Sequence, residues 1–444
     1  MTGNKVREDR RKRPRRRGWL ALMPLVLLGL LMGAMGLLMG DFSKVPMTIV
    51  FAVTGIAALF TLRGYSTEER VQAFSRGAGS PDLLLMVWIF VLAGAFAASA
   101  QAMGAVSATV DLTLRVLPGS ILLGGLFLAS CIVSLCVGTS VGTIVALVPV
   151  AAELAVRTGC GVPLMVAAVV GGSFFGDNLS FISDTTVAST RTQGCQMRDK
   201  FRTNFRIVWP AAFLCFLLYV GIGLCGDSST SVSANAVHPW RVLPYAVVLV
   251  SAIAGVNVMV ILSLGCLLTG VVGLVEGTFD LAGWIRSMAD GVTGMGELIL
   301  ISMMAGGLLA VVRKGGGVTW LVRGLTRHVH TRRGAEWCIS ALVALTNCCT
   351  ANNTVTILSV GSIARDISER YGVDRRRSAS LLDIFSCVVQ GVIPYGAQLL
   401  MAGGLAMISP MRIIPYLYYP LLVAVAAAWS IMCSKSRPAP RETV

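Results

Sequence analysis

Long apolar runs separated by short polar segments make up most of the chain. The first three runs are Trp19–Gly40, Pro46–Leu62 and Leu83–Met103, each about 20 residues and therefore long enough for a helix to cross a bilayer. Apolar and polar residues do not alternate within them, which excludes a transmembrane β-barrel. The pattern predicts an all-α polytopic membrane protein.

Two apolar segments are interrupted by small polar residues. The first is too long for one crossing, and the second begins and ends beside basic segments that we expect in the cytoplasm. Ser120–Ala152 contains Gly138–Thr143, and Ala335–Ser362 contains Thr346–Thr354. Irregular backbone at membrane depth is tolerated only where it is buried or lines a wet cavity. We therefore expect two helical hairpins, with these polar residues at their tips.

Two further segments, Val162–Thr190 and Ala379–Met407, carry carboxylates among apolar residues, and we interpret them as broken spans. With the runs that remain, the pattern predicts about ten crossings and two hairpins. The remaining runs are Trp209–Cys225, Val242–Val275 (two short spans), Val292–Val312 and Pro415–Cys433.

Composition and charge support a membrane protein and predict its orientation. Hydrophobic residues make up 55% of the chain and charged residues 13%, whereas about a quarter are charged in soluble proteins. Residues 1–17 contain nine Lys or Arg, and the loop 313–334 is also strongly basic. Basic loops stay in the cytoplasm, so we expect a cell-membrane protein with both termini cytoplasmic. A tail that binds nucleic acid or anionic lipid is the less favoured interpretation.

Loop charge and run length together predict an inverted repeat. Residues 83–225 are predicted to form a span, a hairpin that enters the membrane from outside, a broken span and a span. Residues 292–433 repeat this order, with the hairpin entering from the cytoplasmic side. Secondary transporters are often built this way. The other expected parts are a basic tail (1–18), two peripheral spans (19–82), a connecting segment (226–291) and a C-terminal tail (434–444).

The first broken span holds the strongest candidate for chemistry. On a continuous helix, Asp177, Ser180 and Asp184 would stand at i, i+3 and i+7 and share one face, with Ser183 beside them. The second broken span repeats this spacing with Asp383, Ser386 and Gln390. We interpret the second set as the counterpart of the first.

A small hard cation such as Na⁺ prefers oxygen ligands, which the broken spans and hairpin tips supply. We expect no cofactor and no histidine-ligated metal, because the three histidines fall in predicted loops. The Na⁺ candidates among the carboxylates are Asp177, Asp184 and Asp383. The full set of candidate ligands is Asp177, Asn178, Ser180, Ser183, Asp184, Thr185, Thr139, Ser140, Thr350, Asn352, Asn353, Thr354, Asp383, Ser386 and Gln390.

Paired carboxylates in an apolar setting suggest a mechanism. Desolvation and a neighbouring carboxylate favour the protonated form of a carboxyl, which can then lose its proton to a metal cation. Competition of H⁺ and Na⁺ for one aspartate gives antiport under alternating access. We expect Asp177 and Asp184 to titrate, while the second half coordinates and closes.

Structural interpretations of the same residues stay open. Asp177 and Asp184 could cap a helix at the membrane surface, because Asp, Asn and Ser are preferred N-caps. The hydroxyl of Thr185 could bond to its own helix, and Asn352 and Asn353 could satisfy freed backbone at a hairpin tip.

Several motifs resemble those of the NhaC-type Na⁺/H⁺ antiporters. Gly176–Thr186 reads G-D-N-L-S-F-I-S-D-T-T, close to the family pattern G-D-x-x-S-P-x-S-D-T-T, and 350–354, 376–386 and 391–398 resemble its second-half motifs. The resemblance implies a cation-coupled transporter with two inverted halves and is compatible with a homodimer. Phe181 departs from the usual proline, so we expect Gly176 to shape the helix break.

Two alternative functions are weighed against Na⁺/H⁺ exchange. Transport of a small carboxylate or amino acid coupled to Na⁺ or H⁺ is the closest, although no Lys or Arg lies deep within the predicted spans. A membrane enzyme is disfavoured, because the chain contains neither H-E-x-x-H nor G-x-x-x-x-G-K-[ST]. The expected partners are membrane lipid and a small cation or organic substrate, and not nucleic acid.

Overall fold

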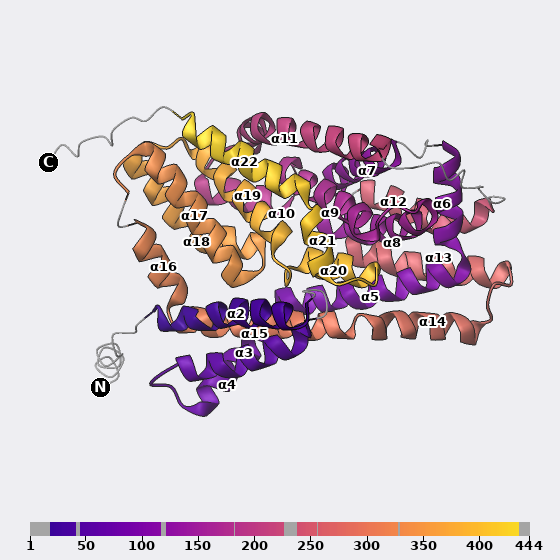
Figure 1. Ribbon diagram of the computed structural model, residues 1–444, viewed down its shortest axis with the longest axis horizontal. Helices are drawn as coiled ribbons and strands as arrows, with labels where there is room; N and C mark the ends of the chain where they lie inside the picture. The colour runs from indigo at the N-terminus through magenta and orange to yellow at the C-terminus, as the bar shows by residue number, and fades with distance from the viewer. Residues whose placement is uncertain are drawn as a thin grey trace, which may run out of the picture. The chain divides into compact units, whose positions relative to one another are not determined.

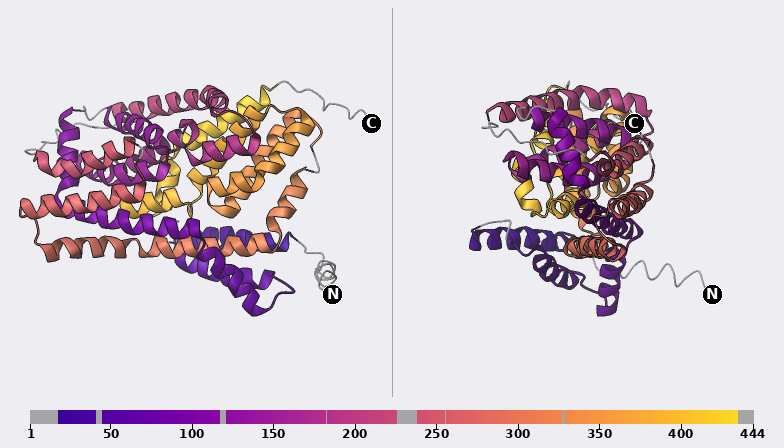
Figure 2. Two further views of the ribbon diagram at one scale, coloured as in Figure 1. Left: turned by 180° about the vertical axis from the view of Figure 1, so that it is seen from behind. Right: turned by 90° about the vertical axis from the view of Figure 1, so that its right-hand side faces the viewer.

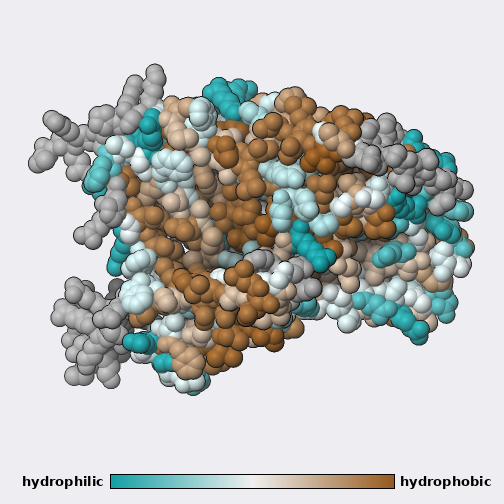
Figure 3. All heavy atoms as spheres, in the orientation of Figure 1, coloured by the Kyte–Doolittle hydropathy of each residue, from teal (hydrophilic) through white to brown (hydrophobic). Residues whose placement is uncertain are grey.

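The structure is a computed structural model that describes residues 18–40, 45–116, 121–181, 183–225, 238–254, 256–326 and 329–434. Within these residues every element is a helix, and eight helices, or nine if one bent pair counts as one span, are long and apolar enough to cross a membrane. Much of the face shown in Figure 3 is hydrophobic, as contact with lipid tails requires. The predicted all-α polytopic class is confirmed, and ten crossings remain a prediction.

The helices group into two compact units, Met1–Leu83 with Leu300–His328, and Leu84–Ile299 with Val329–Val444. The first unit contains η1 (Leu20–Leu22), α2 (Met23–Leu38), α3 (Met47–Thr61), α4 (Thr67–Ala78), most of α15 (Gly296–Lys314) and α16 (Gly317–Thr326). The expected tails, 1–18 and 434–444, lie outside the described residues except at Gly18 and Ser434.

Helix α4 lies between two predicted spans, in a polar segment where the sequence analysis expected no helix, and its first turn shows why it forms. Ser66 accepts a hydrogen bond from the Glu69 N–H, and the Glu69 carboxylate accepts one from the Ser66 N–H. This reciprocal cap satisfies two backbone donors at the start of the helix. The segments 104–119 and 313–334 also contain unexpected helices, namely α6 (Ala105–Val116) and α16.

The second unit contains the candidate site. Besides the helices of the site it contains α5 (Pro81–Met103), α6, α12 (Pro239–Ile253), α13 (Val258–Val275) and α14 (Leu281–Gly294). Glycines allow α5 and α14 to approach closely, because a Cβ on Gly291 would overlap the carbonyl oxygen of Gly94. Such small residues are typical where membrane helices pack backbone against backbone.

Both predicted hairpins form. The first is α7 (Leu122–Val137) with α8 (Ser140–Thr158), and the second is α17 (Arg332–Thr350) with α18 (Asn353–Tyr371). The two helices of the second hairpin lie side by side in Figure 1 and Figure 2. Each turn has one left-handed residue, Gly138 (φ 74°) in the first and Ala351 (φ 48°) in the second.

Both predicted broken helices also form. The first is α9 (Val162–Leu179) followed by α10 (Asp184–Gln193), and the second is α19 (Arg375–Val392) followed by α20 (Ala397–Leu405). Helix α10 packs against α18 and α19, while α20 packs against α8. The second helix of each broken pair therefore packs against the hairpin of the other half of the chain.

The break lies later in the first span than the sequence suggested. The backbone is extended at Ser180 and at Ser183, on either side of the gap between α9 and α10. Asp177, Ser180 and Asp184 therefore do not share one helical face, which corrects our expectation. Gly176 does not cause the break either: it lies inside α9, where a Cβ would overlap Ser134 on α7.

The helix bounds repeat along the chain with a shift of 213 residues. The bounds of α8 and α9, at 140–158 and 162–179, become those of α18 and α19, at 353–371 and 375–392. The same shift relates α2–α6 to α12–α16 within about three residues. This repeat is longer than the expected units 83–225 and 292–433.

A side-chain contact repeats with the same shift. The hydroxyl of Ser134 donates to the carbonyl of Ser173, and the amide of Asn347 donates to the carbonyl of Ser386. The residue that corresponds to Asp177 is therefore Gln390. Asp383, which we had interpreted as the counterpart of Asp177, lies two helical turns earlier, at the position of Val170.

The two halves end differently. In the first half α11 (Met197–Cys225) is one long helix, whereas the corresponding segment is divided into α21 (Pro410–Ile413), η4 (Ile414–Tyr416) and α22 (Tyr418–Met432). Helix α11 packs against α9 and α10 of the first broken helix and against α19 of the second, and also against α7 and α22.

Candidate functional site

A chain of hydrogen bonds links the tips of the two hairpins through both broken helices. The Asp177 carboxylate accepts from the backbone N–H of Ser140, the first residue of α8, at 2.9 Å. The Gln398 amide donates to the Ser140 hydroxyl at 3.0 Å, and the Gln390 amide donates to the Gln398 carbonyl and to the backbone carbonyl of Ala351, both at 2.9 Å. The four elements thus converge on one polar centre.

Asp177 occupies a special place in this centre. It lies inside α9, only 4% exposed, yet its carboxylate binds the first N–H of another helix, α8. Such N–H groups have no partner within their own helix and favour anions. Among the described residues Asp177 forms no ion pair, so its carboxylate lacks a protein cation.

A second buried cluster surrounds Asp383 on α19. The ammonium of Lys200 lies 2.9 Å from the Asp383 carboxylate, and both side chains are almost fully buried, at 1% and 0% exposure. The Asn204 amide donates to the same carboxylate oxygen at 2.7 Å and to the carbonyl of Asn178 at 2.8 Å. Lys200 and Asn204 lie one turn apart on α11, so α11 joins the first broken helix to the second.

The donors of Lys200 are all in use. Besides Asp383, its ammonium contacts the carbonyl of Asn178 at 3.0 Å and the hydroxyl of Thr186 at 2.7 Å. An ammonium has three N–H donors, so the protein leaves none for a ligand.

Lys200 corrects an expectation from the sequence. We expected no Lys or Arg deep within the spans and began this span at Trp209, which left Lys200 outside it. In the structure α11 begins at Met197 and buries Lys200. The missed signal is the pair Lys200 and Asn204 at helical spacing, directly after the broken helix, in a segment where the neighbouring Arg residues stay exposed.

Hydroxyls surround the first break. The Thr185 hydroxyl donates to the carbonyl of Asp177 at 3.1 Å and lies 2.9 Å from the hydroxyl of Ser183. Ser180 is buried beside them. Asp184, which the sequence grouped with Asp177, starts α10 and is exposed.

The tip of the second hairpin is built by polar side chains. Asn347 accepts from the hydroxyl of Thr356 at 3.0 Å, and Thr356 contacts Thr350. Asn352 caps α18 by accepting from the N–H of Val355 at 3.0 Å, so it serves the structural role that we left open. Thr139 caps α8 in the same way through Gly142.

The structure brings most predicted ligands into the buried region. Thr139, Thr350, Asn352 and Thr354 are half-buried at the hairpin tips, and Asp184 alone of the predicted set is exposed. The buried ones are Asp177, Asn178, Ser180, Ser183, Thr185, Ser140, Asn353, Asp383, Ser386 and Gln390. Gln398, Lys200 and Asn204 are site residues that the sequence analysis missed.

Several buried oxygens in this region have no hydrogen-bond partner in the protein. They belong to Asn178 (Oδ1), Asn204 (Oδ1), Asp383 (Oδ1), Gln390 (Oε1) and Thr346 (Oγ1). Buried polar atoms are nearly always satisfied, so these oxygens are available to water or to an oxygen-coordinated cation. Within the described part of the chain no three His, Cys, Asp or Glu side chains converge, so Asp177, Asp184 and Asp383 do not form a three-carboxylate cluster.

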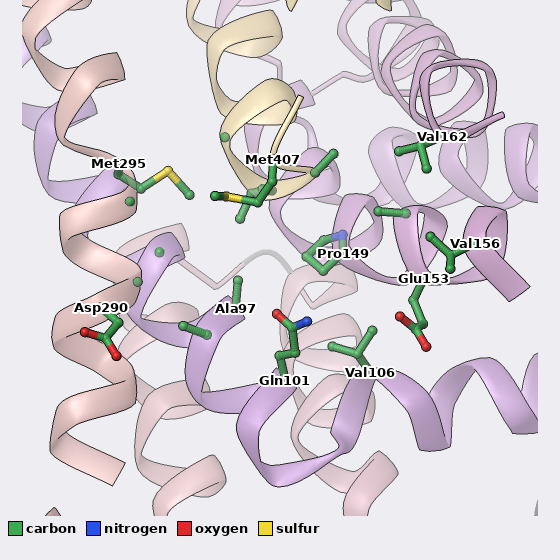
Figure 4. Close-up of a pocket in the computed structure, with 18 residues that line it drawn as sticks. Ala97, Gln101, Val106, Pro149, Glu153, Val156, Val162, Asp290, Met295 and Met407 are labelled. Atoms are coloured by element: carbon green, nitrogen blue, oxygen red, sulfur yellow. The ribbon is translucent and has the colours of Figure 1, made fainter. Parts of the chain in front are cut away.

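A cavity of about 450 Å³ lies apart from these clusters, between α5, α8, α14 and α20. Figure 4 shows the polar side chains of Gln101, Glu153 and Asp290 around it. Neither Asp177 nor Asp383 lines this cavity. Glu153 is paired with Arg157 at 3.0 Å, as expected for a carboxylate with a structural role.

Similarity to known proteins agrees with this arrangement. The model of the Na⁺/H⁺ antiporter family matches residues 18–226 and 229–434, nearly all of the chain in two consecutive halves. The chain belongs to the Na⁺/H⁺ antiporter family. Membership in a family of antiporters supports secondary active antiport as the activity of this protein.

Relatives within and near the family differ in what their names say they carry. The antiporter resembles the malate-2H(+)/Na(+)-lactate antiporter of Bacillus subtilis (21% identity over 89% of this chain and 90% of that protein). It also resembles the Na(+)/H(+) antiporter NhaC of Bacillus subtilis (23%, 80% and 84%). The arginine/ornithine antiporter ArcD of Halobacterium salinarum is 22% identical, over 95% and 94%.

Phe181 occupies the position where the NhaC-type pattern has proline. It lies in the break between α9 and α10, exposed, and its ring stacks on that of Phe201 with 4.7 Å between centroids. The break therefore forms without proline, through the extended residues Ser180 and Ser183.

Proposed function

We propose that this antiporter exchanges Na⁺ for H⁺ across the cell membrane, and that Asp177 is the carboxylate for which the two ions compete. The observation that carries the proposal is the buried Asp177 carboxylate, which binds the N-terminus of α8 and has no ion-pair partner among the described residues. A carboxylate in such a place needs either a proton or a metal cation.

The exchange step is simple and balanced. Protonated Asp177 releases H⁺ as Na⁺ binds its carboxylate, and protonation from the other side releases Na⁺. Neighbouring oxygens would complete the coordination, and Ser140, Thr185 and Gln398 are the groups that bond to Asp177 or to its first partner.

Alternating access finds support in the hydrogen bonds at the two hairpin tips. The bond from Gln398 to Ser140 joins α20 to the first hairpin. Gln390 donates one bond to Ala351 at the second hairpin tip and one to Gln398, which joins α19 to α20. We propose that these few neutral hydrogen bonds break and re-form as the hairpins open to one side or the other. Neutral bonds of about 1 kcal/mol each suit a contact that opens in every cycle.

Exchange of small carboxylates or amino acids is the second candidate, and the names of two relatives favour it. A carboxylate substrate normally requires a cationic donor. The buried Lys200 would be the natural one, but its three donors are committed to Asp383, Asn178 and Thr186. The geometry therefore favours a cation as the transported species.

The test uses purified protein in liposomes with an imposed pH gradient and a pH-sensitive dye inside. External Na⁺ should dissipate the gradient in the wild-type protein, and Asp177→Asn should abolish this response while preserving the hydrogen bond from Ser140. Asp366→Asn is the matched control, because Asp366 is an exposed carboxylate on α18. Li⁺ and K⁺ are tested in parallel.

Lactate, malate and arginine are offered to the same liposomes as radiolabelled substrates. No response to any cation, together with uptake of one of these solutes, would replace the proposed function by the second candidate. A full Na⁺ response in Asp177→Asn would remove Asp177 from the mechanism.

A further inference from the structure

The buried ion pair between Lys200 and Asp383 is separate from the carboxylate that the proposed exchange uses. Lys200 comes from α11 in the first half and Asp383 from α19 in the second, and their charged atoms lie 2.9 Å apart. Asn204 donates to the same Asp383 oxygen, at 2.7 Å. One oxygen of Asp383 thus receives two donors, and its other oxygen receives none.

Burying a charge at this depth costs a large desolvation free energy unless the charge is paired and fully hydrogen-bonded. The ammonium satisfies this condition with three acceptors: a carboxylate, the carbonyl of Asn178 and the hydroxyl of Thr186. Removing either partner would leave one unpaired charge in the interior. The two charges should therefore be present together or absent together.

A count of the buried charges then distinguishes the two aspartates. Lys200, Asp177 and Asp383 are the buried charged side chains of α9, α11 and α19 among the described residues. Lys200 balances Asp383, so one net negative charge remains, on Asp177. The remaining acid of the first broken helix, Asp184, is exposed at the start of α10.

We propose that Lys200 and Asp383 form a permanently neutral pair, so that each cycle exchanges one proton for one monovalent cation and moves no net charge. Lys200 is a positioning residue: it holds the carbonyl end of α9 and the carboxylate of Asp383 but does not contact the ion. Asp383 can still offer its free oxygen as a ligand without exchanging a proton. This inference rests on the proposed cation exchange at Asp177.

The first test measures the pair without using transport. Lys200→Met and Asp383→Asn should each lower the thermal unfolding temperature of the purified protein, and the double variant should regain most of the loss because no charge is left unpaired. Arg202→Met is the control, since Arg202 is an exposed cation on the same helix. Losses that simply add in the double variant would overturn the neutral pair.

The second test measures the charge moved per cycle. In liposomes, the Na⁺ gradient that exactly opposes a fixed pH gradient is determined with and without a potential of 100 mV set by K⁺ and valinomycin. For the wild-type protein this balance point should not move. Transport of one net charge per Na⁺ would shift the balancing Na⁺ ratio about 50-fold, which would overturn the inference.

The double variant connects the two tests. Lys200→Met with Asp383→Asn should recover cation exchange relative to either single variant and should stay independent of the potential. A double variant that folds but remains inactive would overturn the inference, because the pair would then contribute more to exchange than its mutual neutralisation. Loss of all cation responses in the wild-type protein would refute the proposed function, while the unfolding temperatures would still decide whether the pair acts as one neutral unit.

Discussion

The two halves of the second unit share one scaffold and differ in chemistry. Helices α8 and α9 have the same lengths and spacing as α18 and α19, shifted by 213 residues. Three residues before the break the first half has Asp177, which binds the N–H of Ser140, and the second half has Gln390, which binds the carbonyl of Ala351. The two halves therefore repeat the same helix arrangement, but only the first half has a carboxylate at this position.

The same contrast extends to packing and turns. Gly176 lets α9 touch α7, whereas its counterpart in α19 is Val389. The left-handed residue of the first turn is Gly138 and that of the second is Ala351. The first half is thus the more tightly built, as expected if it holds the ion while the second half closes over it.

The largest effect should come from moving the charge between the halves. Asp177→Gln with Gln390→Asp keeps the net charge but places the carboxylate beside the carbonyl of Ala351 instead of the N–H of Ser140. We expect exchange to fall to the level of empty liposomes in the pH-gradient assay. Gln390→Leu alone loses two hydrogen bonds and should slow exchange about tenfold. Equal activity of the swapped and wild-type proteins would mean that the halves are interchangeable.

The packing contrast should appear in stability. Gly176→Ala forces a Cβ against Ser134 and should lower the free energy of unfolding by about 1–3 kcal/mol. Val389→Ala at the equivalent position should cost about 1 kcal/mol or less, because Val389 is half-buried. Denaturant titration in detergent micelles measures both. A harmless Gly176→Ala would show that α7 and α9 can separate freely.

The two hairpin caps should contribute equally. Thr139→Ala and Asn352→Ala each remove the side-chain acceptor at the start of a helix, for an expected cost of about 1 kcal/mol. Thr139→Ser and Asn352→Asp keep the acceptor and serve as controls in the same unfolding titration. If Asn352→Ala abolished exchange without changing stability, Asn352 would be a ligand instead of a cap.

The turn residues should give the smallest effects, with opposite signs. Gly138→Ala puts a side chain on a left-handed residue and should destabilise by about 1 kcal/mol. Ala351→Gly relieves the same strain in the second turn and should stabilise by a few tenths of a kcal/mol, because glycine also gains entropy in the unfolded chain. Thermal shifts of the same sign in both variants would contradict the left-handed geometry of one turn.

The sequence predicted the elements of the site well, because each leaves a local signal. The hairpin tips and broken helices appear as polar residues inside apolar runs. Helices α4, α6 and α16 were missed, since their polar faces resemble loops when only apolar runs are sought.

The pattern of polar residues could not show which residue of the second half corresponds to which residue of the first. Asp177, Ser180 and Asp184 have the spacing of Asp383, Ser386 and Gln390, but the first set crosses a break and the second lies on one helix. Only the helix bounds show that Asp177 corresponds to Gln390. Lys200 was misplaced for a related reason: charge alone cannot show which member of a basic segment turns inward to a partner 183 residues away in the chain.

The most direct test of the account is the number of protons released when Na⁺ binds to the purified protein. Na⁺ is added to weakly buffered protein in detergent, and proton release and apparent affinity are followed against pH. Competition at Asp177 predicts one proton per Na⁺ and, at low pH, an affinity that falls about tenfold per pH unit, both lost in Asp177→Asn. Na⁺ binding that releases no proton, or that persists in Asp177→Asn, would contradict the account.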